Sequence, residues 1–453
     1  MKRVLFSLTL LALAGGVLGC GGSFSGVSPG SATPAPTPTG PPAPGGGGRI
    51  DLSSGAPVGT IYFTSSYGNT ADKTRRQLYA VRSDGSGRTL IASADSSSLY
   101  FRALSPDGKN LVYGVSYGTG KGSYLAKADG SGARTLAADS VYDLTFTPDS
   151  QKIAYTHSDP FSADSRQEAI VESLDGSGKR TVASGTYTAK TRGQLALSPD
   201  GTKLAATGES GLIVENLDGS GRVTLAGADT FGFLGAPVFS PDGKQVAVSL
   251  FHRTDNTKSG VYVLDASGGG VPAAPLLPSS AVDTLTGWTS AGLLYYASTS
   301  RLGSGSQKAS FTWFAADPVS GAARTIASWE PLQSYDLITT LGYGELSPDK
   351  TQLAWADKDL QIYRVSLAGG APQKLTDTVK GANWNPTFNN DGTKITFTSS
   401  RDERGSVEGF AGGGPAGTLY VMSADGSSPT RLIDGYSTDY PQQFRKVKTG
   451  GSR

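Results

Sequence analysis

The chain has 453 residues with one cysteine and two histidines, and its 40 basic residues nearly balance its 38 acidic ones. A net charge near zero provides no basic stripe of the kind that nucleic-acid binding needs, so we expect no nucleic acid among its partners. A single cysteine excludes internal disulfides and any cysteine-based metal site or nucleophile in the body of the chain.

Residues 1–19 have the features of a secretory signal peptide. Two basic residues are followed by an apolar stretch over 4–13 that is too short for a membrane span. The stretch ends in Val-Leu-Gly-Cys, which resembles the lipobox of bacterial lipoproteins, and this resemblance implies that Cys20 is lipidated. The alternative is an ordinary cleaved signal peptide. Because Gly21 stands where an Asp would resemble an inner-membrane retention signal, we expect lipid anchoring at the outer membrane or periplasmic face, with the cell surface as an alternative.

The composition divides the rest of the chain into three parts. Residues 20–50 combine the acylated cysteine with a Pro/Gly/Ser-rich tether that cannot bury enough apolar surface to fold. As a flexible chain this tether would span roughly 30 Å. We expect a globular domain over 51–445 and a disordered tail over 446–453.

A repeated unit fills the globular part. The segment RALSPDGKNLVYG at 102–114 recurs as LTFTPDSQKIAYT (144–156), QLALSPDGTKLAATG (194–208) and PVFSPDGKQVAVS (237–249), and weaker copies follow. In each copy a short apolar strand enters a Ser-Pro-Asp-Gly turn and a second strand leaves it. A third strand, an Asp-Gly-Ser-Gly segment and a short fourth strand come next. Four antiparallel strands every ~40–50 residues are the signature of a β-propeller blade.

The third strands predict a single all-β propeller with eight blades, or seven if residues 284–343 do not form a full blade. The first unit lacks an innermost strand, and the orphan segment DYPQQF at 439–444 could supply it. We therefore expect the C-terminal strand to pair with the first blade and close the ring, which leaves no exposed sheet edge.

Two segments carry a family resemblance. NPTFNNDGTKITFTSSRD (385–402) and LYVMSADGSSPTRL (419–432) resemble the WD40-like (PD40) repeats of TolB-type propellers. The resemblance implies a propeller fold and partners among cell-envelope proteins. It does not imply one activity, because the same scaffold carries binding proteins, hydrolase accessory domains and lyases.

The segment DGSGKRT at 175–181 has the glycines and basic residues of a phosphate-binding loop. Three similar segments occupy the same place between a third and a fourth strand, whereas a phosphate loop leads into a helix N-terminus. We interpret the segment as a hairpin turn with glycines at positive φ, and Lys179 and Arg180 as solvent-exposed residues that leave it. This interpretation argues against a nucleotide ligand.

The sequence contains no convincing catalytic set. The two histidines, His157 and His252, are expected in exposed loops just past second strands, and not as metal ligands. The Gly-x-Ser-x-Gly matches at 26–30 and 114–118 lack the strand-to-helix turn of a nucleophile elbow. No cofactor and no metal site are predicted, although Asp and Asn residues in loops leave a calcium site open as an alternative.

The loops that join each fourth strand to the next blade's first strand surround one mouth of the channel, where propeller ligands commonly dock. They carry aromatic and charged residues that suit a protein, peptide or glycan surface. The candidate binding residues are Tyr100, Tyr142, Tyr187, Arg192, Phe231, Tyr335, Lys380, Trp384, Tyr436 and Tyr440. For any single ring, packing between blades is the alternative.

These observations predict a lipid-anchored, exported propeller that acts as a non-catalytic binding or scaffold protein at the cell envelope. The alternative is a carbohydrate-active or lactonase-like propeller enzyme with carboxylates, and optionally calcium, in its channel. Three or more Asp, Glu or Asn oxygens converging near the channel axis would favour the enzyme.

Overall fold

The computed structural model describes most of the chain from residue 49 onward. The described residues are 49–57, 59–65, 76–94, 99–115, 120–158, 166–186, 194–233, 235–280, 284–298, 311–329, 344–357, 359–378, 381–389, 392–401, 418–432 and 440–444.

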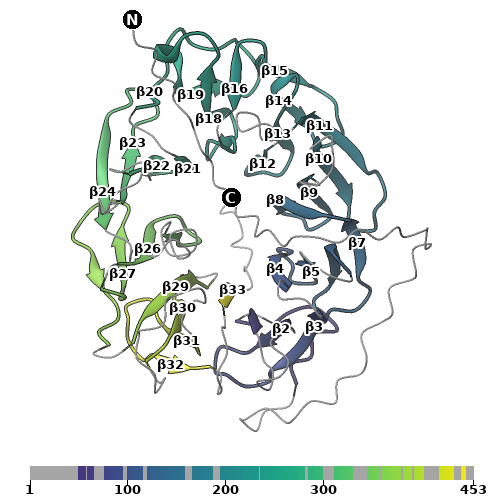
Figure 1. The fold of residues 1–453 in the computed structure, drawn as a ribbon, viewed down its shortest axis with the longest axis vertical. Helices are drawn as coiled ribbons and strands as arrows, with labels where there is room; N and C mark the ends of the chain where they lie inside the picture. Colours follow the sequence, from purple (N-terminus) through teal and green to yellow (C-terminus); the bar gives the residue numbers. More distant parts are fainter. Residues whose placement is uncertain are drawn as a thin grey trace, which may run out of the picture. The chain divides into compact units, whose positions relative to one another are not determined.

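These residues form eight antiparallel sheets in a ring, so the protein is an eight-bladed β-propeller (Figure 1). Seven sheets have four strands, and in the remaining one the innermost strand is divided into two short pieces. The prediction of eight blades is confirmed, because Thr284–Trp329 contains a complete four-stranded sheet.

The strands of each blade follow one another from the channel outward. Blade 1 consists of β33 (Tyr440–Phe444), β1 (Ile61–Ser65), β2 (Arg76–Val81) and β3 (Thr89–Ala94), and blade 2 of β4 (Leu99–Leu104), β5 (Asn110–Val115), β6 (Gly122–Lys127) and β7 (Arg134–Ala137). Blade 3 consists of β8 (Ser140–Phe146), β9 (Lys152–Ser158), β10 (Arg166–Ser173) and β11 (Arg180–Thr186), and blade 4 of β12 (Leu195–Leu197), β13 (Lys203–Gly208), β14 (Gly211–Asn216) and β15 (Val223–Ala226).

Blade 5 consists of β16 (Phe231–Phe233) with β17 (Val238–Phe239), β18 (Gln245–His252), β19 (Gly260–Asp265) and β20 (Leu277–Pro278), and blade 6 of β21 (Thr284–Thr289), β22 (Gly292–Ser298), β23 (Phe311–Ala316) and β24 (Ala323–Trp329). Blade 7 consists of β25 (Glu345–Leu346), β26 (Gln352–Ala356), β27 (Ile362–Ser366) and β28 (Gln373–Lys374), and blade 8 of β29 (Asn383–Phe388), β30 (Lys394–Ser399), β31 (Thr418–Ser423) and β32 (Thr430–Arg431). The 3-10 helix η1 (Asn256–Lys258) lies between β18 and β19.

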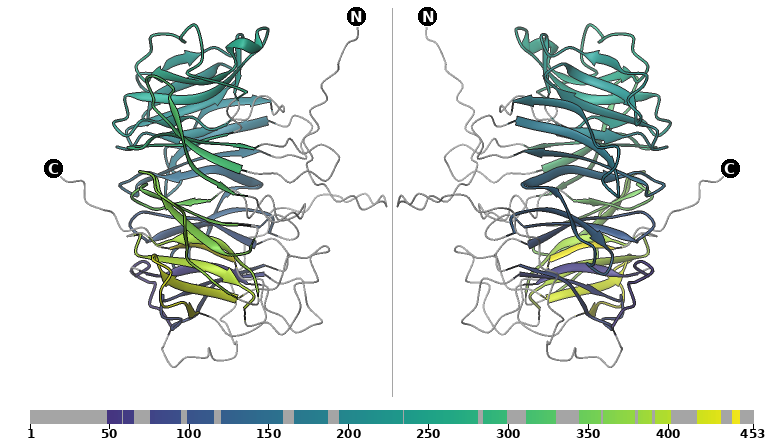
Figure 2. Two further views of the ribbon diagram at one scale, coloured as in Figure 1. Left: turned by 90° about the vertical axis from the view of Figure 1, so that its left-hand side faces the viewer. Right: turned by 90° about the vertical axis from the view of Figure 1, so that its right-hand side faces the viewer.

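The antiparallel order places successive loops on alternate faces of the ring. We call the face with the Ser-Pro-Asp-Gly and Asp-Gly-Ser-Gly turns the turn face. The opposite face, which carries the loops from second to third strands and the connections between blades, is the mouth face. Figure 2 shows the strands running between these two faces.

Side chains within the Ser-Pro-Asp-Gly turn hold it in shape. The hydroxyl of Ser105 donates to Asp107 Oδ1 (2.6 Å) and accepts the N–H of Asn110 (2.9 Å). Ser198 and Asp200 repeat the first of these bonds at 2.5 Å in blade 4. The motif therefore specifies its turn locally, which explains why it recurs wherever a first strand turns into a second.

The C-terminal strand closes the ring as predicted. Strand β33 pairs antiparallel with β1, with Ile61 opposite Phe444 and Thr64 opposite Tyr440. The first blade is thus assembled from both ends of the described chain. This pairing covers the inner edge of β1, which would otherwise expose unpaired backbone groups.

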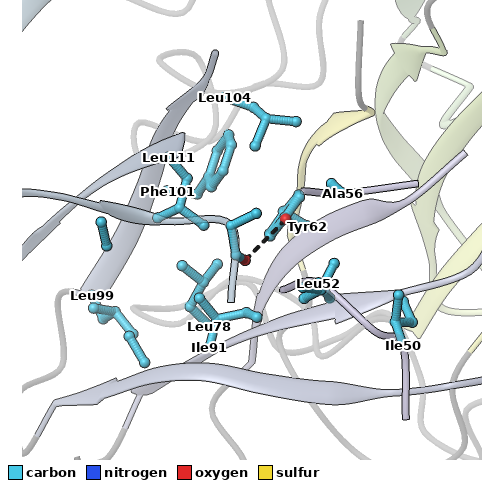
Figure 3. Packing of buried hydrophobic residues seen from close by; sticks show 14 of the residues in the cluster. Ile50, Leu52, Ala56, Tyr62, Leu78, Ile91, Leu99, Phe101, Leu104 and Leu111 are labelled. Carbon is cyan, nitrogen blue, oxygen red and sulfur yellow. Dashed lines mark hydrogen bonds between the residues drawn. The ribbon is translucent and has the colours of Figure 1, made fainter. Parts of the chain in front are cut away.

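The segment ahead of β1 is part of the apolar core between blades 1 and 2 (Figure 3). Ile50, Leu52 and Ala56 are all buried there. The N–H of Ala56 donates to the carbonyl of Gly108 (2.7 Å) and that of Ile50 to the carbonyl of Gly87 (3.2 Å). Since both carbonyls belong to turns, this segment lies against the turn face.

The Asp-Gly-Ser-Gly segments are hairpin turns between third and fourth strands, as predicted. In the turn at 129–132, Gly130 and Gly132 have φ of +86° and +62°, which favours glycine at both positions. A Cβ on Gly130 would clash with the carbonyl of Ile91 in blade 1. The turn therefore also docks one blade closely against its neighbour.

The expectation that Arg180 is solvent-exposed is wrong, whereas Lys179 is exposed. Arg180 is half-buried and forms an ion pair with Glu215 of blade 4, whose side chain is fully buried. It also donates to the carbonyl of Leu217 (3.0 Å). Arg134 makes the same kind of contact between blades 2 and 3, with Glu172. The arginine after the turn thus joins neighbouring blades.

Candidate functional site

Bulges in the innermost strands shape the channel wall at the mouth face. The register of β4 shifts between Phe101 and Ala103, and that of β8 shifts between Tyr142 and Thr145. A bulge bends its strand and redirects side chains, and bulges are common next to binding sites. In this propeller the bulges leave Arg102 and Asp143 exposed on neighbouring inner strands.

Arg102 lies between two tyrosines of blades 2 and 3. Its Cζ is 4.4 Å from the ring centroid of Tyr100 and 5.7 Å from that of Tyr142. We call these three residues the Tyr-Arg-Tyr ladder. Such cation–π contacts contribute about 0.5–1 kcal/mol each at exposed sites. The ladder connects two blades at the mouth face and presents aromatic and cationic groups together.

The structure explains how the Tyr100 ring is placed. Tyr100 is paired with Gly114 of β5, and a Cβ on Gly114 would lie 2.5 Å from the tyrosine ring. The absence of a side chain at position 114 therefore makes room for the ring. Gly114 was noted in the sequence as part of a chance Gly-x-Ser-x-Gly match, and its role in the structure is to accommodate Tyr100.

Tyr142 is the exposed tyrosine of the ladder, whereas Tyr100 is partly buried. It is 41% exposed and, with Val319, is one of two exposed large hydrophobic side chains among the described residues. Aromatic side chains of this kind commonly anchor protein interfaces. Sequence reasoning identified both tyrosines but missed Arg102. The signal that could have found it is the single basic residue within the apolar strand LYFRAL.

A histidine with two carboxylates lies beside the ladder in blade 3. His157 Nδ1 is 3.2 Å from Asp139 Oδ1, and His157 Nε2 is 3.5 Å from Glu168 Oε2. The hydrogen bond with Asp139 raises the pKa of His157, the two carboxylate charges raise it further, and burial lowers it. The expectation of an exposed loop histidine is wrong, because His157 is a half-buried residue of β9.

His252 also differs from the expectation of an exposed loop residue. It ends β18 and is partly buried, and its Nδ1 accepts the N–H of Asp255 (3.0 Å). Its ring packs edge-on against Phe231 at 5.2 Å, and Phe231 contacts Tyr262 at 5.9 Å. Phe231 is only 7% exposed and belongs to the core between blades 4 and 5.

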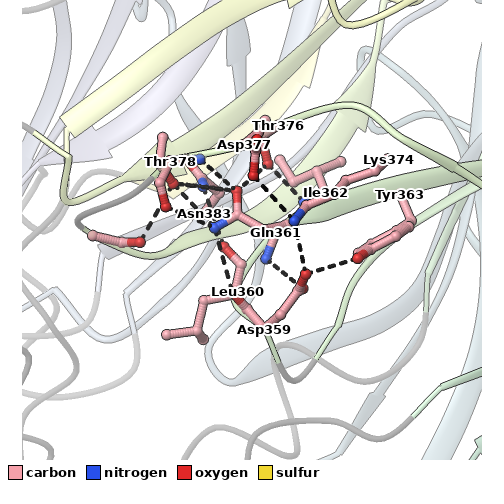
Figure 4. A network of polar contacts seen from close by, with 11 residues as sticks. Asp359, Leu360, Gln361, Ile362, Tyr363, Lys374, Thr376, Asp377, Thr378 and Asn383 are labelled. Atoms are coloured by element: carbon pink, nitrogen blue, oxygen red, sulfur yellow. Dashed lines mark hydrogen bonds and ion pairs between the residues drawn. The ribbon is translucent and has the colours of Figure 1, made fainter.

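Trp384 packs between blades 7 and 8. It is 5% exposed and contacts Ala356 and Ala382. Beside it in the chain, Asn383 is fully buried and its amide donates to Gln361 Oε1 (3.0 Å), while its own oxygen accepts from Ser399 (2.8 Å). Figure 4 shows the polar contacts around Gln361 and Asn383, two buried side chains that join the two blades. Phe231 and Trp384 therefore contribute packing rather than exposed surface.

The structure describes only part of the other predicted site residues. Tyr440 is the first residue of β33, where its backbone pairs with Thr64. The remaining predicted residues lie outside the described ranges: Cys20, Tyr187, Arg192, Tyr335, Lys380 and Tyr436.

A hollow of about 380 Å³ opens on the turn face of blade 6, away from the ladder. There Ser290 and Ala291 form a two-residue turn, since Thr289 pairs directly with Gly292. The Ser-Pro-Asp-Gly turns of other blades are longer, so the short turn leaves space beneath Trp288.

The described residues contain neither a metal-ligand cluster nor a helix that could span a membrane. Within the ranges given above, no group of three or more His, Cys, Asp or Glu side chains has a geometry that could hold a metal ion. No helix in the same part of the chain is both long and apolar enough to span a membrane.

Comparison with known proteins finds similarity to solved structures. No protein-family model matches it, and no curated protein matches it significantly. Similar solved structures include a TolB-like protein from Agrobacterium tumefaciens, at 21% identity over 59% of this chain and 90% of that one, with a TM-score of 0.32. TolB from Acinetobacter baumannii is 16% identical over 85% and 83% of the two chains, with a TM-score of 0.36. An oligogalacturonate lyase from Vibrio parahaemolyticus is 12% identical over 76% and 95%, with a TM-score of 0.45. All three similarities have a TM-score below 0.5 and a sequence identity below 25%. The propeller fold is established by the eight sheets of the chain itself.

Proposed function

We propose that this protein is a non-catalytic binding or scaffold protein of the cell envelope, anchored by lipid at Cys20, that recognises a partner at the mouth face. The partner classes suited to this face are a protein, a peptide or a glycan. The observation that carries the proposal is the Tyr-Arg-Tyr ladder, with Tyr142 exposed at the junction of blades 2 and 3. Tyrosine and arginine are enriched among the residues that dominate binding energy at interfaces.

The position of the N-terminal segment supports this arrangement. Ile50 and Ala56 are hydrogen-bonded to turns of blades 1 and 2 on the turn face, opposite the ladder. A tether that joins the propeller there is compatible with a mouth face open to a partner. The lipid anchor itself rests on the Val-Leu-Gly-Cys motif and the composition of the tether.

The enzyme alternative has no residues to assign among those described. In blade 3 Asp139 and Glu168 flank His157, and both ring nitrogens of the histidine face a carboxylate. A general base needs one of its nitrogens directed at a substrate proton. The arrangement suits a role in stabilising the fold, or in favouring the charged form of His157, better than a role in proton transfer.

Crosslinking from two exposed positions tests the proposal. A photoreactive amino acid is placed at Tyr142 or, as a control, at Val319, which is 87% exposed on the turn face. The full-length protein is then irradiated in its own envelope extract. We expect a discrete crosslinked partner from position 142 and none from position 319, and Tyr142→Ala should lower recovery of the same partner in affinity capture.

Equal crosslinking from both positions would contradict a binding site at the mouth face. So would partner recovery that is unaffected by Tyr142→Ala. Because the side chains of Tyr142 and Val319 are both large, apolar and exposed, comparing crosslinking from the two positions separates specific binding from nonspecific hydrophobic association.

A further inference from the structure

We infer that Arg102 is a carboxylate-binding residue, and that the partner presents an acidic peptide segment to the Tyr-Arg-Tyr ladder. The carboxylate belongs to an Asp or Glu side chain or to a free C-terminus. The inference rests on the proposed function, because it names the chemistry recognised at the same site.

The hydrogen-bond donors of Arg102 are not used by the described residues. Within the described ranges its guanidinium has no hydrogen bond or ion pair, and its contacts are the two tyrosine rings. The arginines on outer strands behave differently. Arg134 donates to the carbonyl of Leu174 (3.0 Å), and Arg222 donates to Glu215 Oε2 (2.7 Å). Arg102 is therefore available to an external acceptor.

The rings of Tyr100 and Tyr142 orient the guanidinium of Arg102. Its five N–H donors lie at the edge of a planar group, so a ring stacked on its face leaves them accessible. A carboxylate can accept two parallel N–H bonds from such an edge. Because Tyr100 and Tyr142 restrict the side chain before binding, less conformational entropy is lost when the carboxylate arrives. The ladder is thus a preorganised site for one planar anion.

The surrounding charge favours a single carboxylate over a polyanion. Asp143 is exposed next to Tyr142 on β8, and Asp139 and Glu168 flank His157, which pairs with Val141 beside Tyr142. A nucleic acid or polyphosphate would need several cations and would be repelled by these carboxylates. An acidic peptide segment contributes one carboxylate to Arg102 and apolar contacts to the exposed face of Tyr142.

Three acetylated hexapeptide probes test the inference by calorimetry with the full-length protein. The first alternates glutamate with glycine and has an amidated end, the second replaces glutamate with glutamine, and the third is the glutamine peptide with a free C-terminal carboxylate. We expect the first or the third to bind and the second not to bind. Binding by the first indicates a side-chain carboxylate, and binding by the third indicates a C-terminal one.

Two variants locate the interaction. Arg102→Gln should weaken binding of the acidic probe about tenfold, because it removes a charge-assisted bidentate contact. Arg253→Gln is the matched control, since Arg253 is an exposed arginine on the same face that donates to the carbonyl of Ala228 (2.7 Å). It should leave binding unchanged.

Binding of the amidated glutamine probe as tightly as the other two, or binding by none of the three probes, would overturn the inference. Unchanged affinity of Arg102→Gln for the acidic probe would also overturn it. So would an equal loss of affinity in Arg102→Gln and Arg253→Gln, because that result indicates general electrostatic attraction. Partner crosslinking from position 142 that persists in Arg102→Gln at full strength would reject the carboxylate contact while leaving the proposed function intact. Loss of crosslinking specificity at position 142 would instead reject the proposed function.

Discussion

Arg180 of blade 3 forms an ion pair with Glu215 of blade 4, a residue whose side chain is completely buried. Arg222 of blade 4 completes the site by donating from Nε to the second carboxylate oxygen of Glu215 (2.7 Å). Arg222 also donates to the carbonyl of Val182 in blade 3 (2.8 Å). One buried carboxylate therefore holds two arginines that together join neighbouring blades.

Replacing Arg180 should destabilise the propeller. In Arg180→Ala the buried carboxylate loses one of its two cations, and breaking a buried ion pair costs about 3 kcal/mol in the free energy of unfolding. Lys179→Ala is the control, because Lys179 is the exposed neighbour in the same turn. Urea unfolding followed by circular dichroism measures both. A loss in Arg180→Ala no larger than in Lys179→Ala would contradict the role assigned to the ion pair.

A second prediction separates turn geometry from blade docking in the Asp-Gly-Ser-Gly segment. Both Gly130→Ala and Gly132→Ala introduce a side chain at positive φ, which costs about 1 kcal/mol. Only the Gly130 variant also places its Cβ against the carbonyl of Ile91, since the nearest atom to a Cβ at 132 is Lys127 Cε at 3.9 Å. We expect the larger drop in thermal unfolding midpoint for Gly130→Ala. Equal drops would show that the turn needs glycine only for its backbone conformation.

Ring closure provides a third prediction. Removing residues 440–453 deletes β33 and exposes the inner edge of β1, from Ile61 to Thr64. An open edge is a template for association between chains, so we expect a lower unfolding midpoint and concentration-dependent aggregation. Removing only residues 446–453 retains β33, and it should change neither the unfolding midpoint nor the aggregation. Light scattering during a thermal ramp distinguishes the two deletions, and identical behaviour would contradict closure by β33.

The architecture was predictable because its signals are local. Ser105, Asp107 and Asn110 interact within a few residues, so each copy of the turn appears in the sequence as a repeated motif. The turns mark the repeat, the third strands of the repeat predict eight blades, and one leftover strand predicts the closure. Each element depends on its own residues, which is why a repeat pattern is a reliable guide to this fold.

Contacts between blades were not predictable in the same way. Arg180 and Glu215 are 35 residues apart in sequence, and neither the pairing nor the burial of Glu215 follows from a motif. The same applies to the ladder, where Arg102 contacts Tyr142 of the next blade. The sequence pattern predicts a strand that ends before His157, whereas β9 continues to Ser158. The two carboxylate neighbours of His157 come from separate segments. Side chains that meet only after the blades pack carry no periodic signal.

Membrane attachment is tested by Cys20→Ser. If Cys20 carries the lipid, the variant should move from the membrane fraction to the soluble envelope fraction, because an acyl chain contributes about 0.8 kcal/mol of membrane affinity per buried CH₂. Fractionation followed by immunoblotting measures the shift, with mass spectrometry of the N-terminal peptide as the control for acylation. Continued membrane retention of the variant would contradict a lipid anchor at this residue.

The last prediction concerns the pH dependence of stability through His157. Its hydrogen bond with Asp139, reinforced by the charge of Glu168, raises the pKa of His157 in the folded protein above the ordinary value of about 6.5. A group whose pKa rises on folding binds its proton more tightly when folded. It therefore stabilises the fold fully below the unfolded pKa, and this contribution is lost as the pH rises through the folded pKa. The thermal unfolding midpoint should fall from about pH 6 to about pH 8, on either side of the histidine range.

His157→Gln should reduce this fall, because glutamine keeps polar contacts to Asp139 but does not ionise. Arg166 also pairs with Glu168 (3.7 Å), and the substitution leaves both residues of this ion pair in place. His252→Gln is the matched control, since it removes the other histidine of the chain. Its thermal unfolding midpoint should decrease with pH as much as that of the unmodified protein. Differential scanning calorimetry across the pH range measures all three proteins. If His157→Gln keeps the full pH dependence, the two carboxylates do not hold a protonated histidine, and the stabilising proton must be sought elsewhere in the fold.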